Sequence, residues 1–195
     1  MTVTARPILL PVILAILILA GCAWSGKASE PRLDEETGVT LSRADMPVVL
    51  YRDASARAAH ARDFVYLGPV QVNRMGSLRY YLWFGVWSAM PATDPAAQRD
   101  SFEDITLFAD GEPMQLSIAG WSPSAIGASR DVYVKPVASA ADAYYEVTID
   151  QIRLIAASQD LRILTSGPDR RTYELWNRQA SAFDALNRFV QQTDY

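Results

Sequence analysis

The chain has 195 residues, of which 50% are hydrophobic, and its formal net charge at neutral pH is −4. This mildly acidic balance, without a basic cluster, argues against nucleic acid as a partner, because phosphate neutralisation needs grouped Lys and Arg side chains. The length suits one domain of roughly 100–200 residues. A single cysteine excludes an internal disulfide and a thiolate metal site.

The chain opens with a lone basic residue, Arg6, followed by an apolar run over Pro7–Leu19 and then by small residues before Cys22. About 20 apolar residues are needed to span a bilayer, and two prolines interrupt this shorter run. The layout is typical of a cleavable signal peptide. Leu19-Ala20-Gly21-Cys22 resembles the lipobox of bacterial lipoproteins. The resemblance implies a diacylglyceryl group on the Cys22 thiol, cleavage before Cys22 and acylation of the new amine.

The lipoprotein resemblance implies an address and a domain layout. Several acyl chains anchor a protein durably, since each buried methylene contributes about 0.8 kcal/mol. Ala23 after the cysteine, where Asp is linked to inner-membrane retention, favours the outer membrane, with the protein facing the periplasm. We therefore expect a signal peptide over 1–21, a flexible polar tether over 22–45 and a single β-rich globular domain over 46–193.

The first half of the domain reads as strands. An extended run over Val48–Tyr51 is expected to start the fold, and Ser55–Arg62, rich in Ala and Arg, to form a short helix. Further strands are predicted, separated by turn residues, over Phe64–Leu67, Val70–Val72 and Leu78–Trp87. The last of these has apolar residues on both faces, which is typical of a strand covered on both sides.

Asp110-Gly111 predicts the clearest hairpin of the chain, because a two-residue Asp-Gly turn favours the type I′ geometry. Pairing outward from this turn places Leu107 opposite Met114 and Ile105 opposite Leu116, all on one face.

The second half adds strands and two helices. Strands are predicted over Asp131–Val137 and Tyr144–Thr148, and a hairpin joins Leu161–Thr165 to Arg171–Trp176 across the turn Ser166–Asp169. Thr148 and Gln151 have the spacing of a capping box that opens a short helix. An amphipathic helix from about Asn177, with Phe183, Leu186 and Val190 on one face, ends the chain. The predicted fold is α+β and mainly antiparallel β, either a sandwich or one curved sheet.

The usual catalytic residues are sparse. His60 is the only histidine, in a predicted helix without metal or triad partners, so neither a zinc site nor a histidine base is expected. The run Gly120–Ser124 matches the G-x-S-x-G nucleophile elbow only at its first three positions, and a surface turn is the simpler interpretation. Paired carboxylates could hydrolyse a glycoside, and the candidates are Glu103, Asp104, Asp110, Glu112, Glu146 and Asp150.

Aromatic side chains are the most informative feature of the domain. Trp83, Trp87 and Tyr81 share one face of a predicted strand, and Trp121 lies in a loop rich in Pro, Ser and Gly. Exposed rings of this kind bind glycans or apolar ligands or anchor protein interfaces. The alternative is that they fill a core, since large rings dominate burial in small β domains.

The sequence thus predicts a lipid-anchored, non-enzymatic module that binds an envelope protein or another envelope component, or that is a structural subunit of an envelope assembly. No cofactor, no metal and no nucleic acid is expected. The alternative is a carboxylate-based hydrolase of envelope glycan, with two acids converging beside Trp121.

Overall fold

Antiparallel pairing joins every strand of the computed structural model, which describes residues 30–193 except 55, 57, 91–94, 169 and 178. The predicted signal peptide, the lipobox with Cys22 and the first part of the predicted tether lie outside the described residues. In chain order the described elements are β1 (Arg32–Asp34), β2 (Val39–Arg43), β3 (Val48–Asp53), β4 (Arg62–Arg74), β5 (Ser77–Ser88), α2 (Pro95–Asp100), β6 (Asp104–Ala109), β7 (Glu112–Gly120), the 3₁₀ helix η1 (Pro123–Ile126), β8 (Ala141–Val147), α3 (Ile149–Ala157), β9 (Leu161–Thr165), β10 (Thr172–Leu175) and α4 (Ala180–Thr193).

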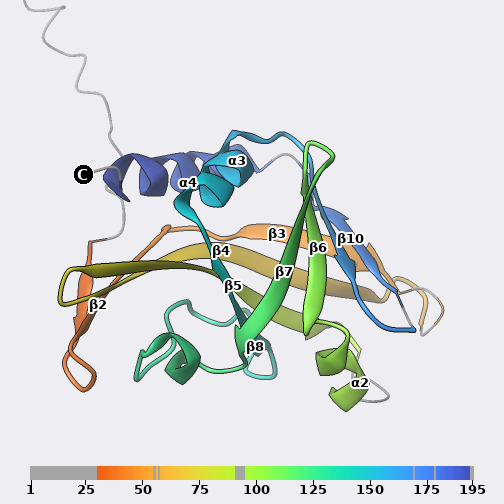
Figure 1. Ribbon diagram of the computed structural model, residues 1–195. Helices are drawn as coiled ribbons and strands as arrows, with labels where there is room; N and C mark the ends of the chain where they lie inside the picture. The colour runs from red at the N-terminus through yellow and green to blue at the C-terminus, as the bar shows by residue number, and fades with distance from the viewer. Residues whose placement is uncertain are drawn as a thin grey trace, which may run out of the picture.

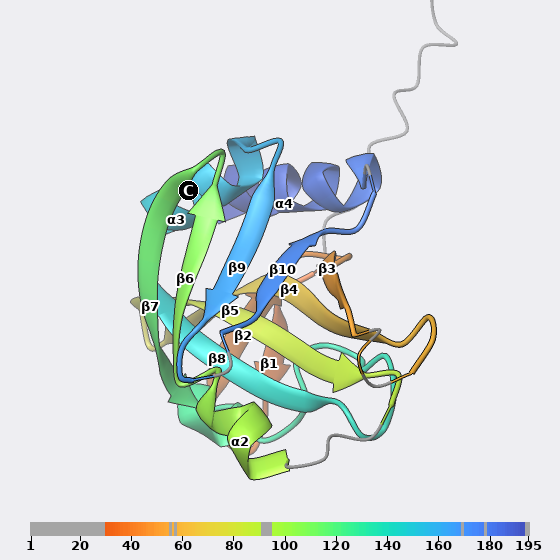
Figure 2. The ribbon, with the colours of Figure 1, turned by 90° about the vertical axis from the view of Figure 1, so that its right-hand side faces the viewer.

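Eight of the described strands close into a barrel (Figures 1 and 2), in the order β4-β3-β10-β9-β6-β7-β8-β5 with β5 pairing back onto β4. The strand β4 is long enough to pair with two different strands along the same edge. Residues 62–67 of β4 pair with β3, whereas residues 70–73 pair with β2, which in turn carries β1. Pro69, which has no N–H to donate, lies where the partner changes.

The mainly antiparallel β fold with short helices is as predicted, but the sheet closes into a barrel and forms neither of the predicted arrangements, a sandwich or one curved sheet. Closure depends on the pairing of β3 with β10, β5 with β8 and β6 with β9, which join residues far apart in sequence. Alternation along a strand predicts which face is buried. It does not identify the neighbouring strand.

The barrel interior is a filled core. Side chains at alternate positions point inward, and Leu50, Leu67, Phe84, Leu107 and Ile163 are all fully buried. Figures 1 and 2 show α3 and α4 lying over one end of the barrel and α2 at the other. Leu186 and Phe189 of α4 are buried in this core together with residues of α3. An eight-stranded barrel is just wide enough for its own side chains to fill.

A second core lies on the outer face of β2, β4 and β5. Residues of the segment that follows β7, among them Ile126, Val132 and Tyr133, pack there against Val39 and Trp83. Residues 32–43 therefore do not belong to a flexible tether as predicted. They form β1 and β2, because Val39 and Leu41 are buried beneath this segment despite their polar neighbours.

Two further local predictions are wrong. The described residues within Ser55–Arg62 form turns and then the start of β4 rather than a helix. The segment Asp131–Val137 is a loop, and its Val132 and Tyr133 pack into the outer core instead of pairing, whereas Val134 is exposed. The predicted strands on either side of Gly68-Pro69 are one continuous strand.

Several local predictions are confirmed in detail. Asp110 and Gly111 have φ values of 49° and 88°, and the predicted register of Leu107 with Met114 is present. Thr148 and Gln151 form both hydrogen bonds of the capping box. The hairpin of β9 and β10 is also present.

Candidate functional site

Two of the four aromatic residues singled out in the sequence belong to the outer core. Tyr81 is 4% exposed, and Trp83 is fully buried. The Trp83 ring stacks on Tyr133 with 4.7 Å between centroids, and its Nε1 donates to the Asp142 carboxylate over 2.9 Å. Asp142 also pairs with Lys135 at 2.7 Å. Trp83 and Tyr81 are therefore packing residues and not a ligand surface.

Two glycines make room for this stack. A Cβ on Gly85 would meet the Trp83 ring at 2.6 Å, and a Cβ on Gly68 would meet the Tyr133 ring at 2.5 Å. The Tyr133 hydroxyl donates to the carbonyl of Pro69 and accepts from the Ala44 amide. The stack thus ties the segment after β7 to β4.

The other two predicted residues, Trp87 and Trp121, come together at the α2 end of the barrel. Both are half-buried, and both line a pocket of about 490 Å³ between α2, the end of β5 and the start of β8. The Arg99 guanidinium lies 5.7 Å from the centre of the Trp121 ring. The pocket lining within the described residues is Val86, Trp87, Ser88, Met90, Ala96, Gln98, Arg99, Asp100, Phe102, Trp121, Ser139 and Ala141. The volume falls in the range of about 300–1,000 Å³ typical of small-molecule sites.

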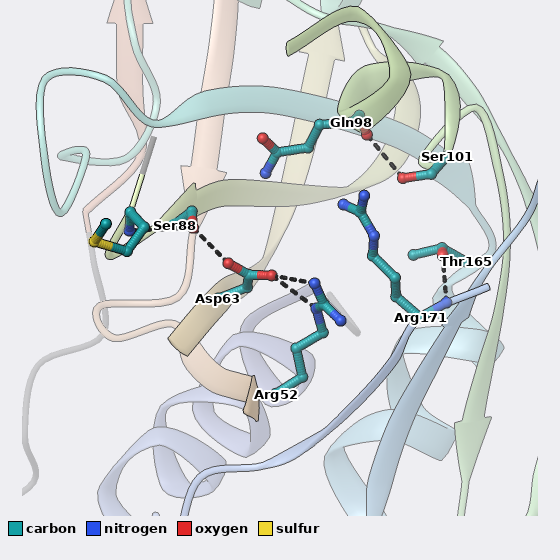
Figure 3. A network of polar contacts seen from close by, with 8 residues as sticks. Arg52, Asp63, Ser88, Gln98, Ser101, Thr165 and Arg171 are labelled. Atoms are coloured by element: carbon teal, nitrogen blue, oxygen red, sulfur yellow. Dashed lines mark hydrogen bonds and ion pairs between the residues drawn. The ribbon is translucent and has the colours of Figure 1, made fainter. Parts of the chain in front are cut away.

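The barrel core changes from apolar to polar at this end. Arg52 of β3, Asp63 of β4 and Ser88 of β5 are cross-strand partners. Arg52 pairs with the buried Asp63 carboxylate at 2.6 Å, and the Ser88 hydroxyl donates to its other oxygen (Figure 3). Arg52, Asp63 and Ser88 each lie an even number of positions from the inward-facing apolar residues of their own strand. All three therefore face the inside of the barrel. The row forms a polar layer at the barrel mouth, and Ser88 reaches from it to the pocket wall.

α2 is joined to the barrel by its C-terminal turn. The Ser101 hydroxyl donates to the Gln98 carbonyl, and the Ser101 carbonyl accepts from the Ser166 amide in the turn between β9 and β10. Across that turn the Arg171 amide donates to the Thr165 hydroxyl. In Figure 3 the side chains of Gln98 and Arg171 point toward the space that Asp63 and Arg52 also face.

Trp87 also takes part in an aromatic cluster on the outer wall. Its ring stacks on Phe64 with 4.6 Å between centroids, Phe64 lies 5.3 Å from Trp176, and Tyr51 meets Trp176 edge-on. Arg62 lies over the rings of Tyr51 and Trp176. Trp87 is held between this cluster and the pocket.

The six candidate carboxylates do not converge. All are exposed, and three have structural roles: Asp110 caps the backbone of Gln159 and Asp160, Asp104 accepts from Ser117, and Asp150 pairs with Arg153. Asp100 is the one carboxylate among the described residues of the pocket lining. The described residues thus give the hydrolase alternative no acid pair at the pocket.

The remaining chemical candidates also have local structural explanations. His60 is exposed in a turn with φ of 63°. Ser122 caps the short helix η1, and its hydroxyl lies 2.7 Å from that of Ser124, so the strand-to-α-helix turn of a nucleophile elbow is missing here. Among the described residues there is no cluster of three or more metal-ligating side chains.

Comparison of the chain with models of protein families, with curated proteins and with solved structures finds no match. No helix in the described part of the chain is long and apolar enough to cross a membrane.

Sequence reasoning missed part of the site. It placed Trp87 and Trp121 among the binding candidates but did not predict α2 or the polar layer. One signal for the layer was available: Asp63 shares its parity with Val65 and Leu67, and Arg52 shares its parity with Val48 and Leu50. A charged residue at an inward position of a strand indicates a buried pair.

Proposed function

We propose that this protein is a lipid-anchored module of the bacterial envelope that binds a small ligand, without turnover, in the pocket at the α2 end of its barrel. The observation that carries the binding role is the meeting of Trp87 and Trp121 at one pocket, from strands and loops far apart in sequence. The anchor rests on Leu19-Ala20-Gly21-Cys22 and on the apolar run before it.

The pocket chemistry supports binding more than catalysis. Seven of the twelve described lining residues are apolar, and the polar ones lie mainly on or beside α2. A mainly apolar cleft with a few polar groups suits recognition. In the described lining, a single carboxylate and no histidine leave no acid–base pair for glycoside hydrolysis.

The anchor is tested by mass spectrometry and detergent partitioning. We expect the envelope protein to begin at Cys22 with three acyl chains, to enter the detergent phase and to fractionate with the outer membrane. Cys22→Ser should move it to the aqueous phase, whereas Ser25→Ala should leave partitioning unchanged. A protein that keeps residues 1–21 and the same partitioning in Cys22→Ser contradicts the anchor.

The pocket is tested by tryptophan fluorescence during titration with an organic-solvent extract of the same envelope. We expect a change in emission that Trp121→Phe largely removes, because Trp121 lines the pocket. Trp176→Phe is the matched control, since Trp176 lies on the outer wall and not in the pocket lining. An emission change that survives in Trp121→Phe and Trp87→Phe contradicts the proposed site.

A further inference from the structure

The barrel mouth holds hydrogen-bond donors that the described residues leave without acceptors. The Trp87 Nε1 and the Tyr173 hydroxyl are both buried with no hydrogen-bond partner in the described structure. A buried donor without a partner costs free energy, so such groups call for an explanation. The two donors lie at the same end of the barrel, Trp87 on its outer wall and Tyr173 in its core, and the described residues supply neither with an acceptor.

Positive charge gathers at the same place. Among the described residues the side chain of Arg171 is half-buried and has neither an ion pair nor a hydrogen bond. The Arg99 guanidinium lies over the ring of Trp121. Burial raises the pKa of Tyr173, and the Asp63 charge adds to the rise, whereas the charges of Arg52 and Arg171 oppose it. The Arg52 guanidinium lies 5.9 Å from the centre of the Tyr173 ring.

The carboxylates do not balance these cations. Asp63 is already paired with Arg52. Among the described residues at the mouth, the exposed Asp100 is then the carboxylate that remains to balance the charges of Arg99 and Arg171. A local excess of positive charge on a chain with a net charge of −4 is complementary to an anion. The pocket walls between Trp87, Phe102 and Trp121 are complementary to an apolar body.

We propose that the ligand of this pocket is an amphiphilic anion, with its acid group held by Arg171 and Gln98 and its apolar body between Trp87 and Trp121. This inference rests on the proposed binding function and adds the chemical class of the ligand. Gln98 lines the pocket. Arg171 lies outside the described lining, and its side chain points with that of Gln98 into the space beside the polar layer (Figure 3). Its amide can donate to an acid oxygen alongside the guanidinium.

The test is calorimetric titration at low ionic strength with decanoate, decyl phosphate, 1-decanol and inorganic phosphate as probes. We expect decanoate or decyl phosphate to bind about tenfold or more tightly than 1-decanol, because hydrogen bonds to a charged group are worth that much. The two acids distinguish a carboxylate from a phosphate headgroup. Inorganic phosphate is expected to bind weakly, since it has no apolar body.

Matched variants locate the acid group. Arg171→Gln and Gln98→Glu should each abolish the preference for the acids while leaving 1-decanol binding unchanged. Arg170→Gln, an exposed neighbour in the same turn, removes the same charge and should keep the preference. Equal binding of 1-decanol and decanoate, or an unchanged preference in both Arg171→Gln and Gln98→Glu, overturns the inference. If 1-decanol and decanoate bind equally, the pocket still binds a ligand and only the ligand class is wrong. If none of the four probes binds, the ligand class is also wrong, and the titration with envelope extract then tests the pocket itself.

Discussion

At the scale of single residues, the outer core depends on two missing side chains. Gly68 and Gly85 provide flat strand surface on which the Tyr133 and Trp83 rings lie, at separations that a Cβ would make impossible. The sequence shows the glycines and the rings but not their contact, because Tyr133 is 65 positions from Gly68 and belongs to a loop. A glycine in a strand interior often marks such a close approach.

We predict that Gly68→Ala lowers the free energy of unfolding by about 1–3 kcal/mol, the usual cost of forcing extra volume into a packed core. Denaturant titration followed by circular dichroism measures this loss. In a Tyr133→Leu background the same substitution should cost much less, because the ring that it meets is gone. An equal cost in both backgrounds contradicts the assignment of the strain to Tyr133.

At the scale of elements, the turn between β1 and β2 is held to the outer-core segment by one carboxylate. Asp34 accepts hydrogen bonds from the Ser129 amide at 2.7 Å, from the Ser129 hydroxyl, and from the amides of Glu36 and Thr37. These hydrogen bonds lower the pKa of Asp34 from 3.8 to about 2, the Ser129 amide contributing most. An exposed ion pair between Arg130 and Glu36, at 3.5 Å, joins the same turn to the same segment.

The ionised form of Asp34 should therefore stabilise the fold above pH 4, and the contribution should be lost as the pH falls through about 2. We predict that Asp34→Asn lowers the melting temperature at pH 7. The difference in melting temperature between the variant and the natural protein should decrease to near zero between pH 4 and pH 2. Thermal unfolding across this range is the measurement. Glu35→Gln, at an exposed position in the same turn, is the control. A difference that is independent of pH contradicts the role of the charge.

The elements show where sequence reasoning succeeds and where it stops. The Asp110-Gly111 hairpin and the Thr148 capping box were predictable because their geometry is set by residues within a few positions. Strands β1 and β2 were not, because their polar composition is that of a tether and only distant contacts bury Val39 and Leu41. The same limit applies to the site: Trp121 was identifiable as a loop aromatic, but its meeting with Trp87 depends on barrel closure.

At the scale of the whole molecule, the barrel and its outer core bury five of the described tyrosines, and burial shifts the pKa of four of them. Burial raises the pKa of Tyr133, Tyr144, Tyr145 and Tyr173 above the usual 10. Since the phenolic form is the one the fold favours, these groups stabilise the native state fully below pH 10. That stability is lost as the pH rises further, because the unfolded chain then releases protons that the folded chain retains.

We predict that a titration of tyrosinate absorbance shows only part of the nine tyrosines ionising reversibly near pH 10, and that the rest ionise together with loss of the circular dichroism signal. Tyr145→Phe removes one hydroxyl, which donates to the Phe102 carbonyl over 2.5 Å, and should reduce the later step. Ionisation of all tyrosines in one reversible step near pH 10, with the fold intact, contradicts the burial of these four.

The two ends of the barrel differ, and we place ligand binding at only one of them. α3 and α4 cover one end of the barrel, and α2 lies at the other (Figure 1). The pocket lined by Trp87 and Trp121 lies at the α2 end. A bulky side chain at Ser139, an exposed position of the pocket lining, should fill the pocket while removing no core contact. Ala138, exposed and outside the described lining, gives a control one residue away.

The most direct measurement is native mass spectrometry of the protein extracted with mild detergent from its own envelope. We predict a small molecule that stays bound to the natural protein and to Ala138→Trp but is absent from Ser139→Trp. A small molecule retained equally by Ser139→Trp, or no bound small molecule in the natural protein, would contradict the claim that this pocket is the binding site.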